Sequence, residues 1–123
     1  MSSIILASQS PRRKQLLQWA EIDFEVLIHP TDESFPAGLS PAEAAMYIAM
    51  EKARAVQQQA ESRTIIAADT IVVLKNDIIG KPKDREDAIH ILSRLNGTAH
   101  QVITGVAIKK ENKEINLYEN QHQ

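Results

Sequence analysis

Residues 64–74 read TIIAADTIVVL and form the most apolar run in this chain of 123 residues. A short apolar run rich in β-branched side chains is typical of a strand at the centre of a sheet. Asp69 interrupts the run, and an unpaired carboxylate is costly to bury. It must be paired, bound to metal, protonated or placed at a cleft, unless it caps a bulge or a strand end. We favour a functional role.

Alternating elements surround this central strand and predict an α/β domain with a mixed sheet. Further strands are predicted at 4–7, 24–28, 78–82, 100–110 and 114–118. Helices are predicted after caps at Ser10, Ser40 and Asp84. In the first helix, Leu16, Leu17 and Ala20 would form the apolar face. The second helix follows the capping box SPAE at 40–43 and runs to about Gln59. The third helix stops at Gly97, and its apolar face would consist of Ala88, Ile91, Leu92 and Leu95.

Composition excludes several classes of function. The chain is 43% hydrophobic with a net charge of −2, so one compact domain is expected and nothing favours a nucleic-acid polymer or an anionic membrane as partner. It has no cysteine, which excludes disulfides and thiolate zinc sites. No apolar run approaches the roughly 20 residues that a bilayer requires. We expect a soluble, cytoplasmic protein.

Arg12 and Arg13 stand in the first turn of the first predicted helix, where unpaired N–H groups already carry about half a positive charge. Two cations there are unfavourable unless an anion occupies the same place. The helix start, both guanidinium groups and the hydroxyls of Ser8 and Ser10 would then converge on that anion. The alternative is a solvated basic patch at the start of a surface helix.

Three further charged residues are candidates. Lys52 interrupts the apolar stripe of the second helix, so it either extends past the core to solvent or points into a cleft. Glu33 lies in a loop where surface acids are common. Lys81 stands between Gly80 and Pro82, in either an ordinary turn or a device that fixes its direction. Together with Arg12, Arg13 and Asp69, these residues suit a polyphosphate with a divalent cation, and oxygen ligands favour Mg²⁺ or Mn²⁺.

The residues resemble a known family. The motifs LASQSPRR (6–13), DE (32–33), EKA (51–53), AADT (67–70), GKP (80–82) and LNGTAHQVITGVA (95–107) look like those of the Maf family of nucleoside triphosphate pyrophosphatases. The resemblance implies a Maf/ITPase-like fold, a mixed twisted sheet flanked by helices. It also implies hydrolysis of a nucleoside triphosphate to the monophosphate and pyrophosphate, with a divalent metal cation as cofactor and possible removal of modified nucleotides.

The resemblance implies roles for individual residues. The family's catalytic proton acceptor falls on Asp69, which with Glu33 would bind the metal. Its substrate-binding positions fall on Ser8, Arg12, Arg13, Lys52, Thr70 and Lys81. Arg12 followed by Arg13, with Thr70 after the aspartate, is similar to the dTTP/UTP branch. Thr70 would point away from Asp69 in a regular strand, or into the same cleft if the strand bulges.

Family chains continue beyond the length of this one. We expect residues 1–123 to form a single Maf-like domain, the N-terminal portion of the family fold without its C-terminal lobe, with a divergent tail at 111–123. The missing lobe carries a glutamine that helps to select the base. An incomplete sheet would expose strand edges and favour self-association, for example as a homodimer. The alternative function is a nucleotide-binding remnant without catalysis, or a regulatory protein related to septum formation.

Overall fold

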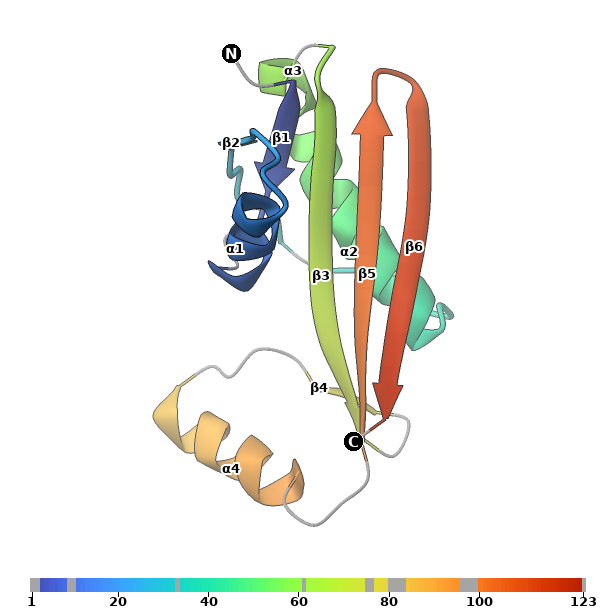
Figure 1. Cartoon of the computed structure of the whole chain (residues 1–123). Helices are drawn as coiled ribbons and strands as arrows, with labels where there is room; N and C mark the ends of the chain where they lie inside the picture. Colours follow the sequence, from blue (N-terminus) through green and yellow to red (C-terminus); the bar gives the residue numbers. More distant parts are fainter. Residues whose placement is uncertain are drawn as a thin grey trace.

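The computed structural model describes residues 3–8, 11–32, 34–60, 62–74, 77–79, 84–95 and 100–122. Figure 1 shows strands and helices alternating along the first part of the chain and a hairpin at its end. The elements are β1 (Ile4–Ala7), α1 (Pro11–Trp19), β2 (Glu25–Val26), α2 (Pro41–Ala55), α3 (Gln57–Ala60), β3 (Thr64–Leu74), β4 (Asp77–Ile79), α4 (Arg85–Leu95), β5 (Gln101–Lys110) and β6 (Lys113–His122).

The strands of the described residues form a six-stranded sheet, in the order β2-β1-β3-β5-β6 with β4 paired to β3 off this path. β1 runs parallel to β2 and β3, whereas β5 runs antiparallel to β3 and β6. The predicted mixed sheet is therefore confirmed. Register between β3 and β5 is continuous from Ile65 to Val73, so the strand is regular and Asp69 and Thr70 point to opposite faces.

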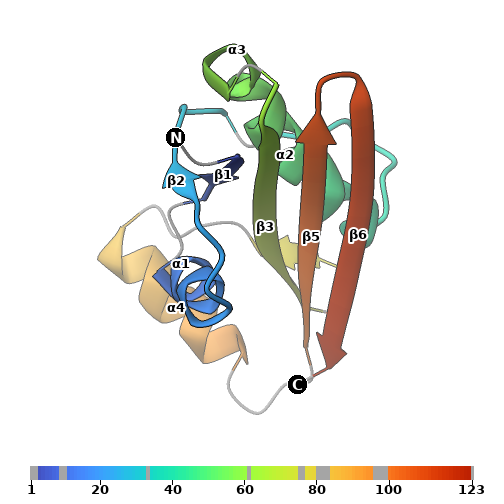
Figure 2. The ribbon, with the colours of Figure 1, turned by 45° about the horizontal axis from the view of Figure 1, so that its top comes forward.

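One face of the sheet is covered by α2, which lies behind β3 and β5 in both Figure 1 and Figure 2. The predicted capping box starts this helix: Glu43 N–H donates to Ser40 Oγ (3.2 Å), and Ser40 N–H donates to Glu43 Oε1 (3.0 Å). Its inward stripe is mostly small, with buried alanines, and packs on Ile5, Ile65 and their neighbours in the main core. Small side chains let the helix backbone approach the sheet closely.

The closest approach is at Gly105 of β5. A Cβ atom placed on Gly105 would lie 2.5 Å from the carbonyl carbon of Ala45 and 2.5 Å from the nitrogen of Met46. These are backbone atoms of α2, so no side chain can rotate to make room. Glycine is therefore required here by the distance between helix and sheet.

Several predicted boundaries were wrong. β2 has two residues, not the five of 24–28, because only Glu25 and Val26 pair with the short strand β1. The predicted long helix is interrupted at Val56, whose φ of −104° and ψ of 4° end α2 before α3 begins. β6 continues four residues past the predicted 118 because β5 is long enough to pair with it throughout.

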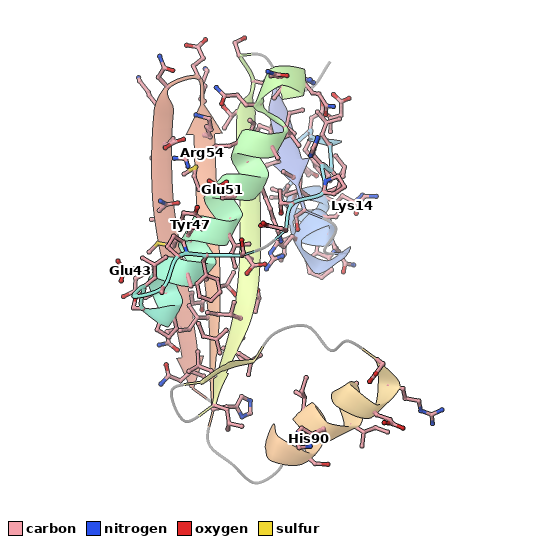
Figure 3. The ribbon with its side chains drawn as sticks, turned by 180° about the vertical axis from the view of Figure 1, so that it is seen from behind. Lys14, Glu43, Tyr47, Glu51, Arg54 and His90 are labelled. Atoms are coloured by element: carbon pink, nitrogen blue, oxygen red, sulfur yellow. The ribbon has the colours of Figure 1, made fainter. Side chains whose placement is uncertain are left out.

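The two remaining helices pack less than expected. In α1 the predicted apolar face is wrong for Leu16 and Ala20, which are exposed, and Trp19 is 71% exposed. α4 stands apart from the long strands (Figures 1 and 3), with Ile89 exposed and Ala88 and Ile91 half-buried. Ser10, Gly97 and the side chains of Leu92 and Leu95 lie outside the described residues. No described helix is long and apolar enough to cross a membrane.

A charged cluster attaches the β5–β6 hairpin to α2. Arg54 donates to both carboxylate oxygens of Glu114 (2.9 and 2.8 Å), and Lys109 donates to the same carboxylate (3.1 Å). Hydrogen bonds from Arg54 and then from Lys109 lower the pKa of the Glu114 carboxyl to about 2. Figure 3 shows Arg54 and Glu51 on the same stretch of α2, where they also form an ion pair. Glu114 therefore faces the α2 side of the sheet.

The contact at Gly105 predicts a costly substitution. Gly105→Ala would push α2 away from β5, and overpacking of this kind costs about 1–3 kcal/mol in the free energy of unfolding. Urea denaturation measures the loss. Gly38→Ala is the matched control: it has no atom within 4 Å of the new Cβ and a φ of +88°, so its cost of about 1 kcal/mol comes from the backbone alone. A Gly105→Ala protein as stable as the parent would contradict the close packing.

Candidate active site

In the part of the chain that the structure describes, one edge of β3 is only partly paired with other strands. On the edge that faces β1, β1 pairs with Thr64–Ala67 and β4 pairs with Val72–Leu74. Among the described residues, no strand pairs with residues 68–71 on this edge, although β5 pairs with them on the other. Asp69 and Thr70 lie in this open stretch, just past the carboxyl end of β1. Ligands of α/β proteins usually bind at such strand ends.

The Asp69 carboxylate is paired. Asp69 is 8% exposed, and its Oδ1 accepts a hydrogen bond from Lys52 Nζ at 3.1 Å. Side chains of a helix tilt toward its N-terminus, so Lys52 extends back along α2 toward the place where Asp69 stands opposite Gly105. Of the two alternatives for Lys52, the structure shows the one in which the ammonium points inward.

Arg13 approaches the same stretch from α1. Its guanidinium donates to Ser8 Oγ (3.3 Å) and to Thr70 Oγ1 (2.6 Å). Burial lowers the pKa of Arg13 below its ordinary value, and the negative charge of Asp69 opposes that shift. The guanidinium therefore lies within electrostatic range of Asp69 and hydrogen-bonds to a residue on the opposite face of β3. It reaches both because the edge of β3 is open at this point.

The structure thus brings together five of the predicted site residues: Ser8, Arg13, Lys52, Asp69 and Thr70. Arg12 lies in α1, but its side chain is outside the described residues. Glu33 and Lys81 also lie outside the described residues, so their predicted roles stay predictions. Among the residues that are described, no three His, Cys, Asp or Glu side chains gather as a metal site.

Sequence reasoning missed Thr104 of β5. Its Oγ1 is 3.0 Å from Thr70 Oγ1. Thr70 already accepts a hydrogen bond from Arg13, and an arginine can only donate. The positive charge polarises the Thr70 hydroxyl, which favours donation of its proton to Thr104. Thr104 could be found only from its position opposite Thr70 in the sheet. That register is a property of the folded sheet, and a threonine within a predicted strand does not reveal it.

Comparison with known proteins shows the family of this chain. A family model described as Maf-like protein matches residues 3–123. The chain belongs to the Maf-like protein family. The match includes residues 111–123, the predicted divergent tail, most of which forms β6.

Curated relatives of this Maf-like chain are longer than it is. It is 44% identical over 119 residues to a dTTP/UTP pyrophosphatase of Bacillus cytotoxicus, covering 97% of this chain and 62% of that protein. A dTTP/UTP pyrophosphatase of Bacillus pumilus is 41% identical, with 97% and 63% covered. The chain therefore spans a little under two thirds of the length of these relatives.

Solved structures support the fold. A HAM1 protein from Coxiella burnetii matches 99% of this Maf-like chain with a TM-score of 0.64 at 15% identity, and 72% of that protein is covered. The Ham1 protein of Staphylococcus aureus matches 97% of the chain with a TM-score of 0.61 at 16% identity, covering 69% of that protein. At these identities the likeness concerns the fold, and it confirms the predicted α/β architecture.

The Lys52–Asp69 pair predicts strong energetic coupling. Lys52→Met keeps the alkyl stem but leaves a buried carboxylate without its ammonium partner, which should lower the free energy of unfolding by about 1–3 kcal/mol. Asp69→Asn should cost less in the Lys52→Met background than in the parent, with a coupling of about 0.5–3 kcal/mol. Urea unfolding of the parent, both single variants and the double variant measures this coupling. Additive losses would contradict a pair that stabilises the fold.

Proposed function

We propose that this Maf-like chain carries the phosphate-handling part of a pyrophosphatase that hydrolyses dTTP and UTP to the monophosphate and pyrophosphate. The observation that supports this most is the meeting of Asp69, Lys52 and Arg13 at the open stretch of β3. Hydrogen bonds hold the two cations beside this carboxylate at the carboxyl end of β1. Cations fixed in this way are suited to bind the oxygens of a polyphosphate. The names of the relatives support the choice of nucleotide.

Each side chain then has a distinct part in the reaction. Asp69 accepts the proton of the water that attacks the α-phosphorus, since it is the carboxylate at the centre of the cluster. Lys52 and Arg13 stabilise the negative charge that develops on the phosphate oxygens. Ser8 holds the Arg13 guanidinium in place at the carboxyl end of β1. Arg12 and Lys81 would add positive charge along the rest of the phosphate chain.

A divalent metal fits the donor set. Mg²⁺ and Mn²⁺ prefer carboxylate oxygens, and Mg²⁺ is usually held by one or two carboxylates together with substrate phosphates. Asp69 supplies one such carboxylate, and Glu33 would supply the second. The ion would neutralise phosphate charge and favour ionisation of bound water. We place this chemistry in the cytoplasm, where nucleoside triphosphates are found.

A second function, binding of nucleoside triphosphates without cleavage, is favoured by one observation: Lys52 already occupies an oxygen of the carboxylate that would accept the proton from water. Incubation with dTTP or UTP and Mg²⁺ or Mn²⁺ separates the two functions. Release of monophosphate supports the enzyme, whereas nucleotide-dependent thermal stabilisation without product supports the binder. Absence of both effects contradicts both functions.

The catalytic assignment of Asp69 is tested by Asp69→Asn. The amide keeps the shape of the side chain but cannot accept the proton from water, so turnover should fall by about 10²- to 10⁴-fold. Release of pyrophosphate from dTTP measures the rate. Asp23→Asn is the matched control, because Asp23 is exposed and makes none of the site contacts. Full turnover by Asp69→Asn would overturn the assignment.

Thr104 is expected to position Thr70 and, through it, Arg13. Thr104→Val keeps the shape but removes the hydroxyl, and the loss of one hydrogen bond should raise KM about three- to tenfold with a smaller change in kcat. Thr104→Ser restores the hydroxyl and should recover most of the lost affinity. Thr64→Val, at the other end of β3, is the control and should leave KM unchanged. Equal KM values for Thr104→Val and the parent would contradict this role.

A further inference from the structure

The position of the Lys52 ammonium depends on the rotation of α2 about its own axis. The centre of the helix face that rests on the sheet carries Ala45, Ala49 and Ala53, each of them 0% exposed. Side chains of one methyl group form shallow ridges, which oppose the rotation of a packed helix less than large side chains do. The contact at Gly105 sets the distance between α2 and β5 but does not by itself stop the helix from rolling.

The two cations of α2 lie on opposite flanks of the helix. Each residue of an α-helix is turned by about 100° from the one before, so Lys52 and Arg54 are about 200° apart. Lys52 contacts Asp69 of β3, whereas Arg54 contacts Glu114 of β6, and β3 and β6 are the two neighbours of β5. Figure 3 shows Arg54 on the side of α2 that faces the hairpin. A roll that lifts one flank lowers the other, so a fixed Arg54 also fixes Lys52.

The contact of Arg54 with Glu114 has a defined direction. Nε and a terminal nitrogen of the guanidinium donate to the two carboxylate oxygens (2.9 and 2.8 Å), and the other terminal nitrogen donates to Glu51 one turn earlier (3.0 Å). Lys109, which is 5% exposed, donates to the same carboxylate and to the carbonyl oxygen of Glu111. Two-pronged contacts between arginine and a carboxylate fix orientation as well as distance.

The helix and β5 advance together between two points of attachment. At the first, Ala45 lies against Gly105; at the second, Arg54 binds Glu114, which stands opposite Lys109 in the sheet. The nine residues of helix between these points span about 14 Å, and so do the four residues of strand. Both attachments are therefore satisfied without sliding the helix along the sheet, and the lysine of the site lies between them.

A small roll is enough to separate the site pair. The ends of helix side chains lie about 5–6 Å from the axis, so a roll of about 20° would displace them by about 2 Å. Lys52 Nζ is 3.1 Å from Asp69 Oδ1, and a displacement of this size exceeds the range of a hydrogen bond. A change of the lysine side-chain torsions would then be needed to bring the ammonium back.

We propose that Glu114 is a positioning residue: it holds Arg54, fixes the rotation of α2 and so keeps the Lys52 ammonium beside Asp69. Glu114 acts through the helix and does not itself contact a nucleotide. Its effect on turnover rests on the proposed function, in which Lys52 stabilises charge that develops on the phosphate. Its effect on the contact between Lys52 and Asp69 is independent of any nucleotide.

That contact can be measured by unfolding alone. Urea unfolding of the parent, Lys52→Met, Asp69→Asn and the double variant gives a coupling factor. This is the ratio by which the double substitution differs from the product of the two single effects on the unfolding equilibrium constant. The same four proteins are then prepared with Glu114→Gln, which keeps the shape of the side chain and removes its charge. The coupling factor should fall at least about twofold, because the ammonium is no longer held on the carboxylate.

Glu25→Gln is the matched control. Glu25 also accepts a hydrogen bond from an arginine, Arg63 (2.6 Å), but it lies in β2, at the opposite end of the strand order from β6. Loss of this ion pair should change stability and leave the coupling factor as it is in the parent. An unchanged coupling factor in Glu114→Gln, an equal fall in Glu25→Gln, or additive effects in the parent cycle would each overturn the positioning role.

Arg54→Lys is a milder variant of the same contact. It keeps the charge of α2 but replaces the two-pronged contact by a single ammonium, so the coupling factor should fall by less than in Glu114→Gln. It takes the place of Glu114→Gln in the cycle if that protein does not fold. A coupling factor equal to that of the parent in Arg54→Lys would then count against the role.

Pyrophosphate release from dTTP connects the contact to the reaction. Glu114→Gln should lower kcat about three- to tenfold with little change in KM, because Lys52 acts on charge that grows in the transition state. Glu25→Gln should leave both constants unchanged. A lower coupling factor in a parent without turnover supports the positioning role and contradicts the proposed function. A lower coupling factor with full kcat shows that the helix is positioned by Glu114 but overturns its effect on the reaction.

Discussion

The distance between α2 and the sheet determines the geometry of this molecule. At Gly105 the helix backbone rests on β5 with no side chain between them. That contact brings the start of α2 against the middle of β5, directly beside Asp69 in the register. Lys52, two turns further along, can then reach the carboxylate at 3.1 Å. A larger residue at 105 would move the whole helix and with it the Lys52 ammonium group that contacts Asp69.

The arginine of α1 depends on a different feature, the incomplete pairing of β3. If β1 continued for three more residues, its backbone would occupy the edge where Arg13 now meets Thr70. β1 instead ends at Ala7 and α1 begins at Pro11, and Arg13 in the first turn of this helix reaches the open stretch. Leu16 and Trp19 are exposed as a consequence, because this helix packs little of its length on the sheet. The helix therefore adds little apolar surface to the core, and its main contact with β3 is the hydrogen bond from Arg13 to Thr70.

Much of this could be predicted from local signals, and the failures share a cause. The capping box at Ser40 and the strand at 64–74 were predictable because each depends only on residues that are close in the sequence. The cost of burying a carboxylate predicted that Asp69 would be paired, bound to metal, protonated or placed at a cleft, and the structure shows it paired with Lys52. The two-residue β2 and the break at Val56 depend on where the sheet offers a partner. Thr104 could not be found at all, because its importance comes from standing opposite Thr70.

Electrostatics connect the fold to the proposed chemistry. Removal of water from Arg13 is unfavourable, which is why burial lowers its pKa, and the single carboxylate of Asp69 compensates only partly. Asp69 also accepts a hydrogen bond from Lys52, so both cations and the carboxylate lie in one cluster. Cations that hydrogen bonds already hold in place need little rearrangement when negative charge arrives or grows beside them. Under the proposed function, binding of a polyphosphate would recover the stability given up in burying Arg13, which would link the cost of the fold to the affinity of the site.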